Sequence, residues 1–222
     1  MNSQDFMRLR KKRKMKRTKL ETLGILGVVS LLSYTAMVTI SPFFYPDYDS
    51  MTMAVSELTA EGAPSKAMAD QLNALFGPCG LVSITAFWAS LDKDKPKSFR
   101  IGIALFMAME WVCSVGYSLF PWISGESSMY FQNIMHMVVT VAVVVLSLLS
   151  LIVLSFSSAK AGLKSLGVWA MVALIAMVLG PIGTSFLPSS VFGLFERFST
   201  FSAVVFNAVL GVYLFNGMLR KA

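Results

Sequence analysis

Six long stretches of apolar residues alternate with polar or proline-bearing breaks along this chain. They lie at 21–41, 68–90, 101–120, 131–157, 166–187 and 198–219. A helix needs about 20 apolar residues to cross the hydrocarbon core of a bilayer. Lipid offers no partners to backbone groups, so spans of this length are helical. The pattern predicts an all-α polytopic membrane bundle of six transmembrane helices over 21–219, with a segment 1–20 before it and a tail 220–222 after it.

The composition agrees with a membrane protein. Hydrophobic residues make up 55% of the 222 positions and charged residues only 14%, and the mean hydropathy is +0.66. Soluble domains carry about 25% charged residues. We therefore expect a multi-pass protein of the cell membrane.

The basic residues predict the orientation of the spans. Nine Lys and Arg precede the first span, four lie between spans 2 and 3, two between spans 4 and 5, and two after span 6. The other side of the membrane receives only Lys66 and Arg197. Loops rich in Lys and Arg stay in the cytoplasm, so we expect both termini to be cytoplasmic.

The net charge of +7 does not indicate nucleic-acid binding. Its largest contribution is the basic run 8–19, directly before the first span. There each basic residue gains about 1 kcal/mol from anionic lipids of the cytoplasmic leaflet. The run sets the orientation of the first span in the membrane. The more specific alternative is a lipid-regulated switch or a binding site for a partner. We expect membrane lipids and membrane proteins as partners.

A short motif recurs and suggests a duplicated hairpin. Span 3 ends in "GYSLFP" at 116–121 and span 5 in "GTSFLP" at 183–188, an offset of 67 residues. Both copies end a span on the outer side, so spans 3–4 and 5–6 would be parallel repeats. The alternative is that small residues before proline simply recur where helices end.

The only histidine, His136, lies near the outer end of span 4. Gln132 and Asn133, four and three residues earlier, share its helix face. An ionisable group at this depth needs a partner or water. We consider a neutral histidine bonded to a carbonyl or to Glu57, and a catalytic or ligand-binding histidine. One histidine is a sparse metal site, so we expect no metal and no cofactor.

Two further polar residues lie deep inside spans. Glu110 is near the middle of span 3, the costliest place for a charge, and Asn207 lies at a similar depth in span 6. A buried hydrogen bond between them would join two helices; a proton or ion relay is the alternative. Cys79 and Cys113 also lie within spans, and we expect both to pack in the core without a disulfide.

At the start of span 6, Glu196 and Arg197 stand together on the outer side, where acidic residues predominate. Glu196 would cap the helix through its dipole. Arg197 would support the same structure, or else pair with Glu57 or a lipid phosphate.

Soluble-enzyme signatures are missing from the sequence. It has no P-loop, no G-x-S-x-G and no H-E-x-x-H. A triad of Ser56, Glu57 and His136 would need two adjacent residues to serve one imidazole, which is poor geometry.

Several short motifs occur in an order that resembles one family. They are "YD" at 48–49, "SEL" at 56–58 with Gly62 and Pro64, Asn73, "FP" at 120–121, His136, and "GLFER" at 193–197. Together they are similar to an uncharacterised bacterial and archaeal six-span membrane family catalogued as domain of unknown function 998. Members often carry an acid soon after the Phe-Pro pair, whereas here the nearest is Glu126.

The resemblance implies a site, while the family has no established activity. It implies that one outward-facing cluster contains Glu57, Asn73, His136, Glu196 and Arg197.

Three functions follow from the residues. The first is a non-enzymatic protein whose outer polar pocket binds a lipid or small ligand, or an accessory subunit. The second is a membrane enzyme with His136 as general base and Glu57 orienting it. The third is a transporter or channel using Glu110.

Overall fold

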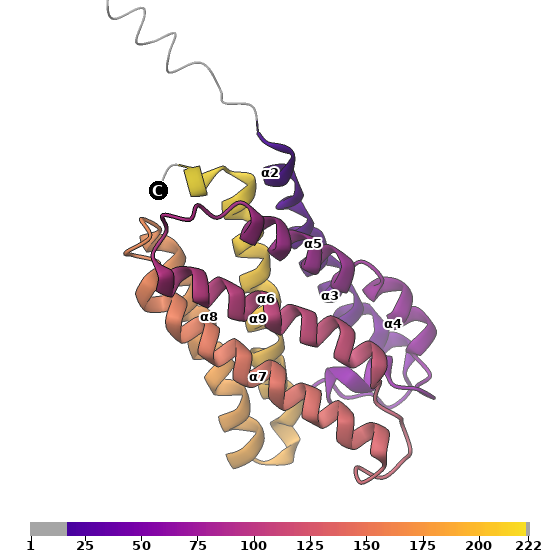
Figure 1. The fold of residues 1–222 in the computed structure, drawn as a ribbon. Helices are drawn as coiled ribbons and strands as arrows, with labels where there is room; N and C mark the ends of the chain where they lie inside the picture. Colours follow the sequence, from indigo (N-terminus) through magenta and orange to yellow (C-terminus); the bar gives the residue numbers. More distant parts are fainter. Residues whose placement is uncertain (1–16, 221–222) are drawn as a thin grey trace, which may run out of the picture.

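The computed structural model describes residues 17–220, so most of the basic run 8–19 lies outside the described residues. Six helical segments in this part are long and apolar enough to cross a membrane. The same part contains no β-strand, only one isolated bridge between two loops. The predicted all-α six-span bundle is confirmed (Figure 1).

The six spans are built from eight α-helices, two of which are short extensions. Their bounds are α2 Lys19–Leu23, α3 Ile25–Ile40, α4 Lys66–Asn73, α5 Phe76–Ala89, α6 Lys97–Leu119, α7 Phe131–Ser157, α8 Lys164–Phe186 and α9 Phe192–Phe215. Short 3-10 helices follow at Ser41–Phe44 (η1), Val55–Thr59 (η2), Ser189–Val191 (η3) and Met218–Arg220 (η4).

Span 2 is interrupted between α4 and α5. The proline ring of Pro78 clashes with the carbonyl four residues earlier in a continuous helix, and the chain breaks there, around Ala74. Two hydroxyls of α3 satisfy carbonyls at the break. Ser33 donates to the Leu72 carbonyl at 2.5 Å and Ser30 to the Phe76 carbonyl at 2.7 Å. A broken span is therefore tolerated because its neighbour replaces the lost partners.

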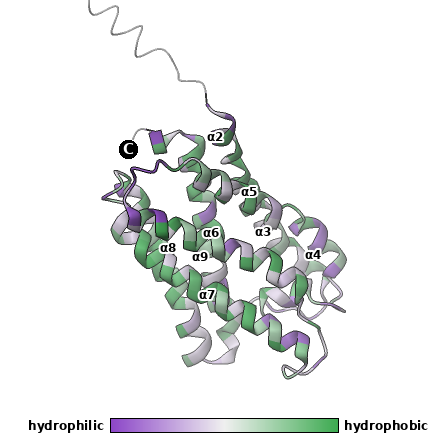
Figure 2. Cartoon of the chain, in the orientation of Figure 1, coloured by the Kyte–Doolittle hydropathy of each residue, from purple (hydrophilic) through white to green (hydrophobic). Residues whose placement is uncertain are grey.

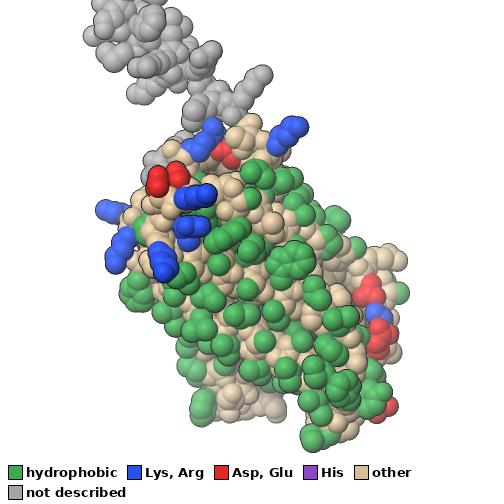
Figure 3. Space-filling view, in the orientation of Figure 1, with side chains coloured by type: hydrophobic (Ala, Val, Ile, Leu, Met, Phe, Trp, Pro, Cys, Tyr) green, Lys and Arg blue, Asp and Glu red, His purple; other side chains and the backbone are tan. Residues whose placement is uncertain are grey.

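Helix α9 is the centre of the bundle. It contacts α3, α5 and α8, while α6 and α7 pair as a hairpin against α5 and α8 (Figure 1). Within the apolar window of its span, 56% of residues are buried, against 28–39% in the other five. Figure 2 shows that the long helices are composed largely of apolar residues, and Figure 3 shows apolar side chains spread over the middle of the visible surface, as expected of a surface that meets lipid.

Charge is distributed unevenly between the two ends of the bundle. Most visible Lys and Arg side chains gather at the end that carries α2 and η4, which we call the terminal end, whereas acidic residues and a Lys lie beside α4 (Figure 3). At the terminal end, Arg220 pairs with Glu21 at 2.6 Å. At the opposite end, Lys66 pairs with Glu61 at 3.3 Å and Asp70 at 2.7 Å. We call the latter end the loop end.

The first helices of the hairpins α6–α7 and α8–α9 match each other in length and in the way they end. Helices α6 and α8 both contain 23 residues, and their starts and ends are 67 residues apart. Each ends on an equivalent bond: Phe120 N–H donates to the Gly116 carbonyl at 2.9 Å, and Leu187 N–H to that of Gly183 at 3.1 Å. The motif thus marks the same helix terminus in both copies. The second helices do not keep the offset, because α7 and α9 start 61 residues apart and end 58 residues apart, so the duplication stays a prediction.

Glycines bring α9 directly against the first span. A Cβ on Gly211 would lie 2.3 Å from the Gly24 carbonyl oxygen and 2.9 Å from the Ser83 hydroxyl. Contacts this close between helix backbones are typical of small-residue interfaces in membranes. Any larger side chain here would separate α9 from α2 and α3.

Substituting Gly211→Val is expected to destabilise the bundle by about 1–3 kcal/mol, the usual cost of overpacking. The measurement is thermal unfolding in detergent micelles, followed by circular dichroism. The adjacent Val212, which is 40% exposed, provides the control Val212→Leu, for which we expect little change. Equal unfolding temperatures for Gly211→Val and the wild type would contradict this packing.

Candidate functional site

The loop end carries two longer loops, 45–65 and 120–130, which we call the first and second outward loops after the side of the membrane predicted for them. Arg197 fastens the first outward loop to α9. It lies in the second turn of the helix, and its Nη1 donates to the carbonyls of Ser50 at 2.8 Å, Met53 at 3.1 Å and Gly193 at 2.7 Å. Its Nη2 donates to the Tyr48 hydroxyl at 2.7 Å. The planar fork of arginine makes this many-partner arrangement possible.

Glu196 also binds this loop, and its predicted role as the cap of its own helix is wrong. Helix α9 begins at Phe192 and has no side-chain cap. Glu196 Oε2 instead accepts from the N–H of Val55, the first residue of η2, at 2.8 Å. Glu57 accepts from the N–H of Ala54 at 3.3 Å. Both carboxylates therefore satisfy free N–H groups at the start of η2.

Tyr48 connects Arg197 with the residues that precede η2. Its hydroxyl donates to the Ala54 carbonyl at 2.9 Å and accepts from Arg197. Burial raises the pKa of Tyr48 to about 12, although the Arg197 guanidinium alone would lower it. The phenol is therefore neutral at physiological pH, as its donated hydrogen bond requires. We call Tyr48, Glu57, Glu196 and Arg197 the α9 group.

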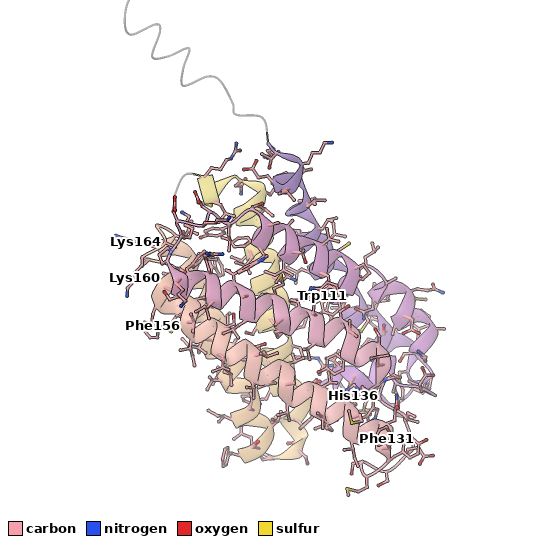
Figure 4. The ribbon with its side chains drawn as sticks, in the orientation of Figure 1. Trp111, Phe131, His136, Phe156, Lys160 and Lys164 are labelled. Carbon is pink, nitrogen blue, oxygen red and sulfur yellow. The ribbon has the colours of Figure 1, made fainter. Side chains whose placement is uncertain are left out.

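His136 binds the second outward loop. It is 7% exposed and lies towards the loop end of α7 (Figure 4). Its Nδ1 is 2.8 Å from the Phe120 carbonyl oxygen. A carbonyl only accepts, so Nδ1 carries the hydrogen, and Nε2 is the acceptor of the neutral ring. The imidazole packs against Tyr117 at 4.8 Å and Trp122 at 5.7 Å, measured between ring centroids.

The two polar neighbours of His136 bind the same loop. The buried Asn133 exchanges hydrogen bonds with Ile123, accepting from its N–H at 2.9 Å and donating to its carbonyl at 3.3 Å. Gln132 donates to the Leu119 carbonyl at 3.0 Å. We call Gln132, Asn133 and His136 the α7 group, and its members together close the turn between α6 and α7.

The hydrogen bonds of the described residues place the expected outer residues in two groups. None of these bonds joins His136 directly to Glu57, Glu196 or Arg197. The loops themselves are joined: Glu61 N–H donates to the Trp122 carbonyl at 2.7 Å, and Ser124 N–H to that of Glu61 at 3.0 Å.

Asn73, the remaining outer residue, ends α4 and belongs to neither group. Its Oδ1 is buried without a hydrogen-bond partner in the part of the chain that the structure describes.

Glu110 and Asn207 lie deep in the bundle, where they are 6% and 2% exposed. The Glu110 carboxylate interacts with the Asn207 side-chain amide, and the amide also donates to the Gly80 carbonyl at 3.4 Å. Towards the terminal end, the same face of α6 carries Phe106 and Ile103, both fully buried.

Residues 17–220 contain no group of three His, Cys, Asp or Glu side chains arranged to hold a metal ion. Cys79 and Cys113 are free thiols, as the sequence predicted.

An apolar groove between α8 and α9 was not predicted from the sequence. It measures about 340 Å³. On α8 it is lined by Trp169, Val172, Ala173 and Ala176; on α9 by Leu194, Arg197, Phe198, Phe201, Ser202, Val205, Phe206 and Val209. Spacings of three and four residues place each set on one helix face. This spacing could have indicated the groove in the sequence, but every apolar membrane helix contains residues spaced in this way.

Comparison with known proteins identifies the family. A family model described as "Protein of unknown function (DUF998)" matches residues 28–213. The chain belongs to this family. The resemblance found in its outer motifs is thereby confirmed over most of the chain. Searches of curated proteins and of solved structures match nothing, so the site must be interpreted from its own geometry.

Replacing Arg197 by Lys is expected to loosen the first outward loop. Lysine keeps the charge but cannot reach the same carbonyls with a planar fork, and hydrogen bonds from charged groups contribute about 1.5–3 kcal/mol. Amide hydrogen exchange over 48–57 should therefore become at least roughly tenfold faster. The control is Lys160→Arg, an exposed position at the other end of the bundle. Unchanged exchange in Arg197→Lys would contradict the fastening role.

Tyr48→Phe is expected to remove one tyrosine that ionises near pH 12. The pKa of this phenol is raised in the folded state, so its contribution to stability is complete below pH 10, its ordinary pKa, and is lost as pH rises towards about 12. The measurement is the ultraviolet difference titration of wild type against Tyr48→Phe. A difference transition near pH 10 would show that this phenol is exposed.

Proposed function

We propose that this protein binds a membrane lipid and that the groove between α8 and α9 holds one hydrocarbon chain. The observation that carries the proposal is the groove itself, about 340 Å³ and lined almost entirely by apolar side chains. Ligand sites in proteins begin at about 300 Å³. In a bilayer, the molecules that surround such a groove are lipids.

The dimensions favour a hydrocarbon chain over a protein helix. The lining of α9 extends from Leu194 to Val209, a rise of roughly 22 Å. A whole helix of about 10 Å diameter would lie against this groove and not inside it. A single flexible chain fits a narrow groove of this length.

Arg197 supports a lipid with an anionic headgroup. It lines the groove at the loop end, and the ion pairs of the described residues do not include it. Its recorded bonds go to uncharged oxygens, so its positive charge is not neutralised by a carboxylate at ion-pair distance. A lipid phosphate would complement that charge.

The orientation of the bundle follows from its charges. The terminal end, with α2 and η4, is the basic one on the face that Figure 3 shows, so we propose that it lies in the cytoplasm, with the protein in the cell membrane. The headgroup at Arg197 then belongs to the outer leaflet. A role as accessory subunit of a membrane assembly is compatible with this arrangement, because a bound lipid can lie between two membrane proteins.

The contacts of the polar residues favour binding over the other two functions. A general base oriented by Glu57 needs a carboxylate at His136, whereas the recorded partner of its Nδ1 is the Phe120 carbonyl. A transport path through Glu110 needs polar groups on both sides. On α6, the side towards the termini consists of Phe106, Ile103 and Phe99, all fully buried and packed in the core.

The decisive experiment is native mass spectrometry of lipids retained by the protein. The double variant Ala173→Phe, Ala176→Phe fills the groove, and we expect it to lose the retained lipid. Val168→Phe, on the same helix but 65% exposed and outside the groove, is the matched control and should retain it. Retention by both would exclude the groove as the site.

Two further variants of the same experiment locate the headgroup. Arg197→Gln should reduce the preference for anionic over zwitterionic lipids while leaving the chain bound. His136→Ala should retain the lipid, because the α7 group lies outside the groove. Loss of the lipid in His136→Ala alone would move the binding site to the α7 group.

A further inference from the structure

Polar groups of four helices meet around Gly80 in the middle of the bundle. A Cβ on this glycine of α5 would lie 3.1 Å from the Ser30 hydroxyl of α3, 3.1 Å from Asn207 Nδ2 of α9 and 3.4 Å from Glu110 Oε2 of α6. A side chain at this position would press on all three groups. The groove and the outer groups do not use these residues.

The charge of Glu110 has no partner there. The ion pairs in the described part of the chain do not involve it, and the nearest charged residues of α9, Glu196 and Arg197, precede Asn207 by ten residues or more, about 15 Å along the helix. The other titratable groups in the membrane part of these helices are Cys79 of α5, Cys113 and Tyr117 of α6, Tyr34 of α3 and Tyr213 of α9, none of which is a cation. The cations of α6, Lys97 and Arg100, precede Glu110 by ten residues or more. An ionised carboxylate at this depth is costly.

A second observation identifies what the site lacks. Asn207 Oδ1 is buried and, among the described residues, has no hydrogen-bond donor. The nitrogen of the same amide donates to the Gly80 carbonyl, and the Asn207 side chain interacts with Glu110. A carboxylate cannot donate to this oxygen, but a carboxylic acid can. One proton on Glu110 would remove the buried charge and supply the missing donor.

We propose that Glu110 is a proton-binding site in which the neutral acid donates its O–H to Asn207 Oδ1 while the Asn207 amide faces the other carboxyl oxygen. Acid and amide then form a closed pair that joins α6 to α9. Deprotonation would open the pair and leave a charge between the helices. Phe206, next to Asn207, packs on Phe106 at 5.2 Å and also lines the groove, so the proton site and the groove share one helix segment.

A sodium ion bound by the same oxygens is the rival occupant, and infrared spectroscopy separates the two. The full chain in lipid nanodiscs is compared with Glu110→Gln, whose amide keeps the shape of the neutral acid. At pH 7 the difference spectrum should contain a carboxylic-acid carbonyl band. A carboxylate band in its place would overturn the proposal, as would conversion of the acid band to a carboxylate band by sodium chloride but not by potassium chloride.

Asn207→Leu tests the pairing itself. Removal of the acceptor should shift the acid band of Glu110 to the position of a weakly hydrogen-bonded acid, and an unshifted band would refute the pair. Glu61→Gln is the control, because this exposed carboxylate pairs with Lys66 and should contribute only carboxylate bands. This test uses neither the variants nor the readout of the lipid experiment, so failure of one proposal leaves the other unaffected.

Discussion

Inside a bilayer a polar group has no water to bind, and this constraint governs the structure from one end to the other. The break in span 2 is tolerated because Ser30 and Ser33 donate to its carbonyls. At the loop end, Arg197 and His136 bind main-chain oxygens of the two longer outward loops. Both are the sixth residue of the helix that follows a turn, α9 and α7. At these three places polar side chains thus replace water where a helix is broken or ends.

Helix α9 takes part in most of the contacts that satisfy polar groups in this bundle. Its loop end fastens the first outward loop through Glu196 and Arg197, its middle presents Asn207 to Glu110, and its other half packs through Gly211 against Gly24. One face of the same helix forms half of the groove. A ligand in that groove therefore contacts the helix that contributes both to the α9 group and to the pair of Glu110 and Asn207. This is why we relate lipid binding and proton binding to one helix, although they are separate proposals.

The spans, the acidic loops at one end of the bundle and the polar strip beside His136 could be predicted from sequence because hydrophobic length and helical spacing are local properties. The family, too, could be identified from short motifs in order. The hydrogen-bond partners of these polar residues were harder to predict from the sequence. The cap assigned to Glu196 was wrong because the helix starts one turn earlier and the carboxylate reaches another segment, η2. The groove was missed because it belongs to two helices whose faces look ordinary separately.

The sequence by itself determined that this chain is a six-helix membrane protein, that its charges differ between the two ends, and which few residues are costly in lipid. Only the tertiary structure decided what those residues contact. Glu57 and Glu196 bind η2, His136 binds a carbonyl, and Glu110 faces Asn207 across Gly80. The physical reason is that hydrophobicity acts on each segment alone, whereas a hydrogen bond or a groove exists only after helices distant in sequence have packed together.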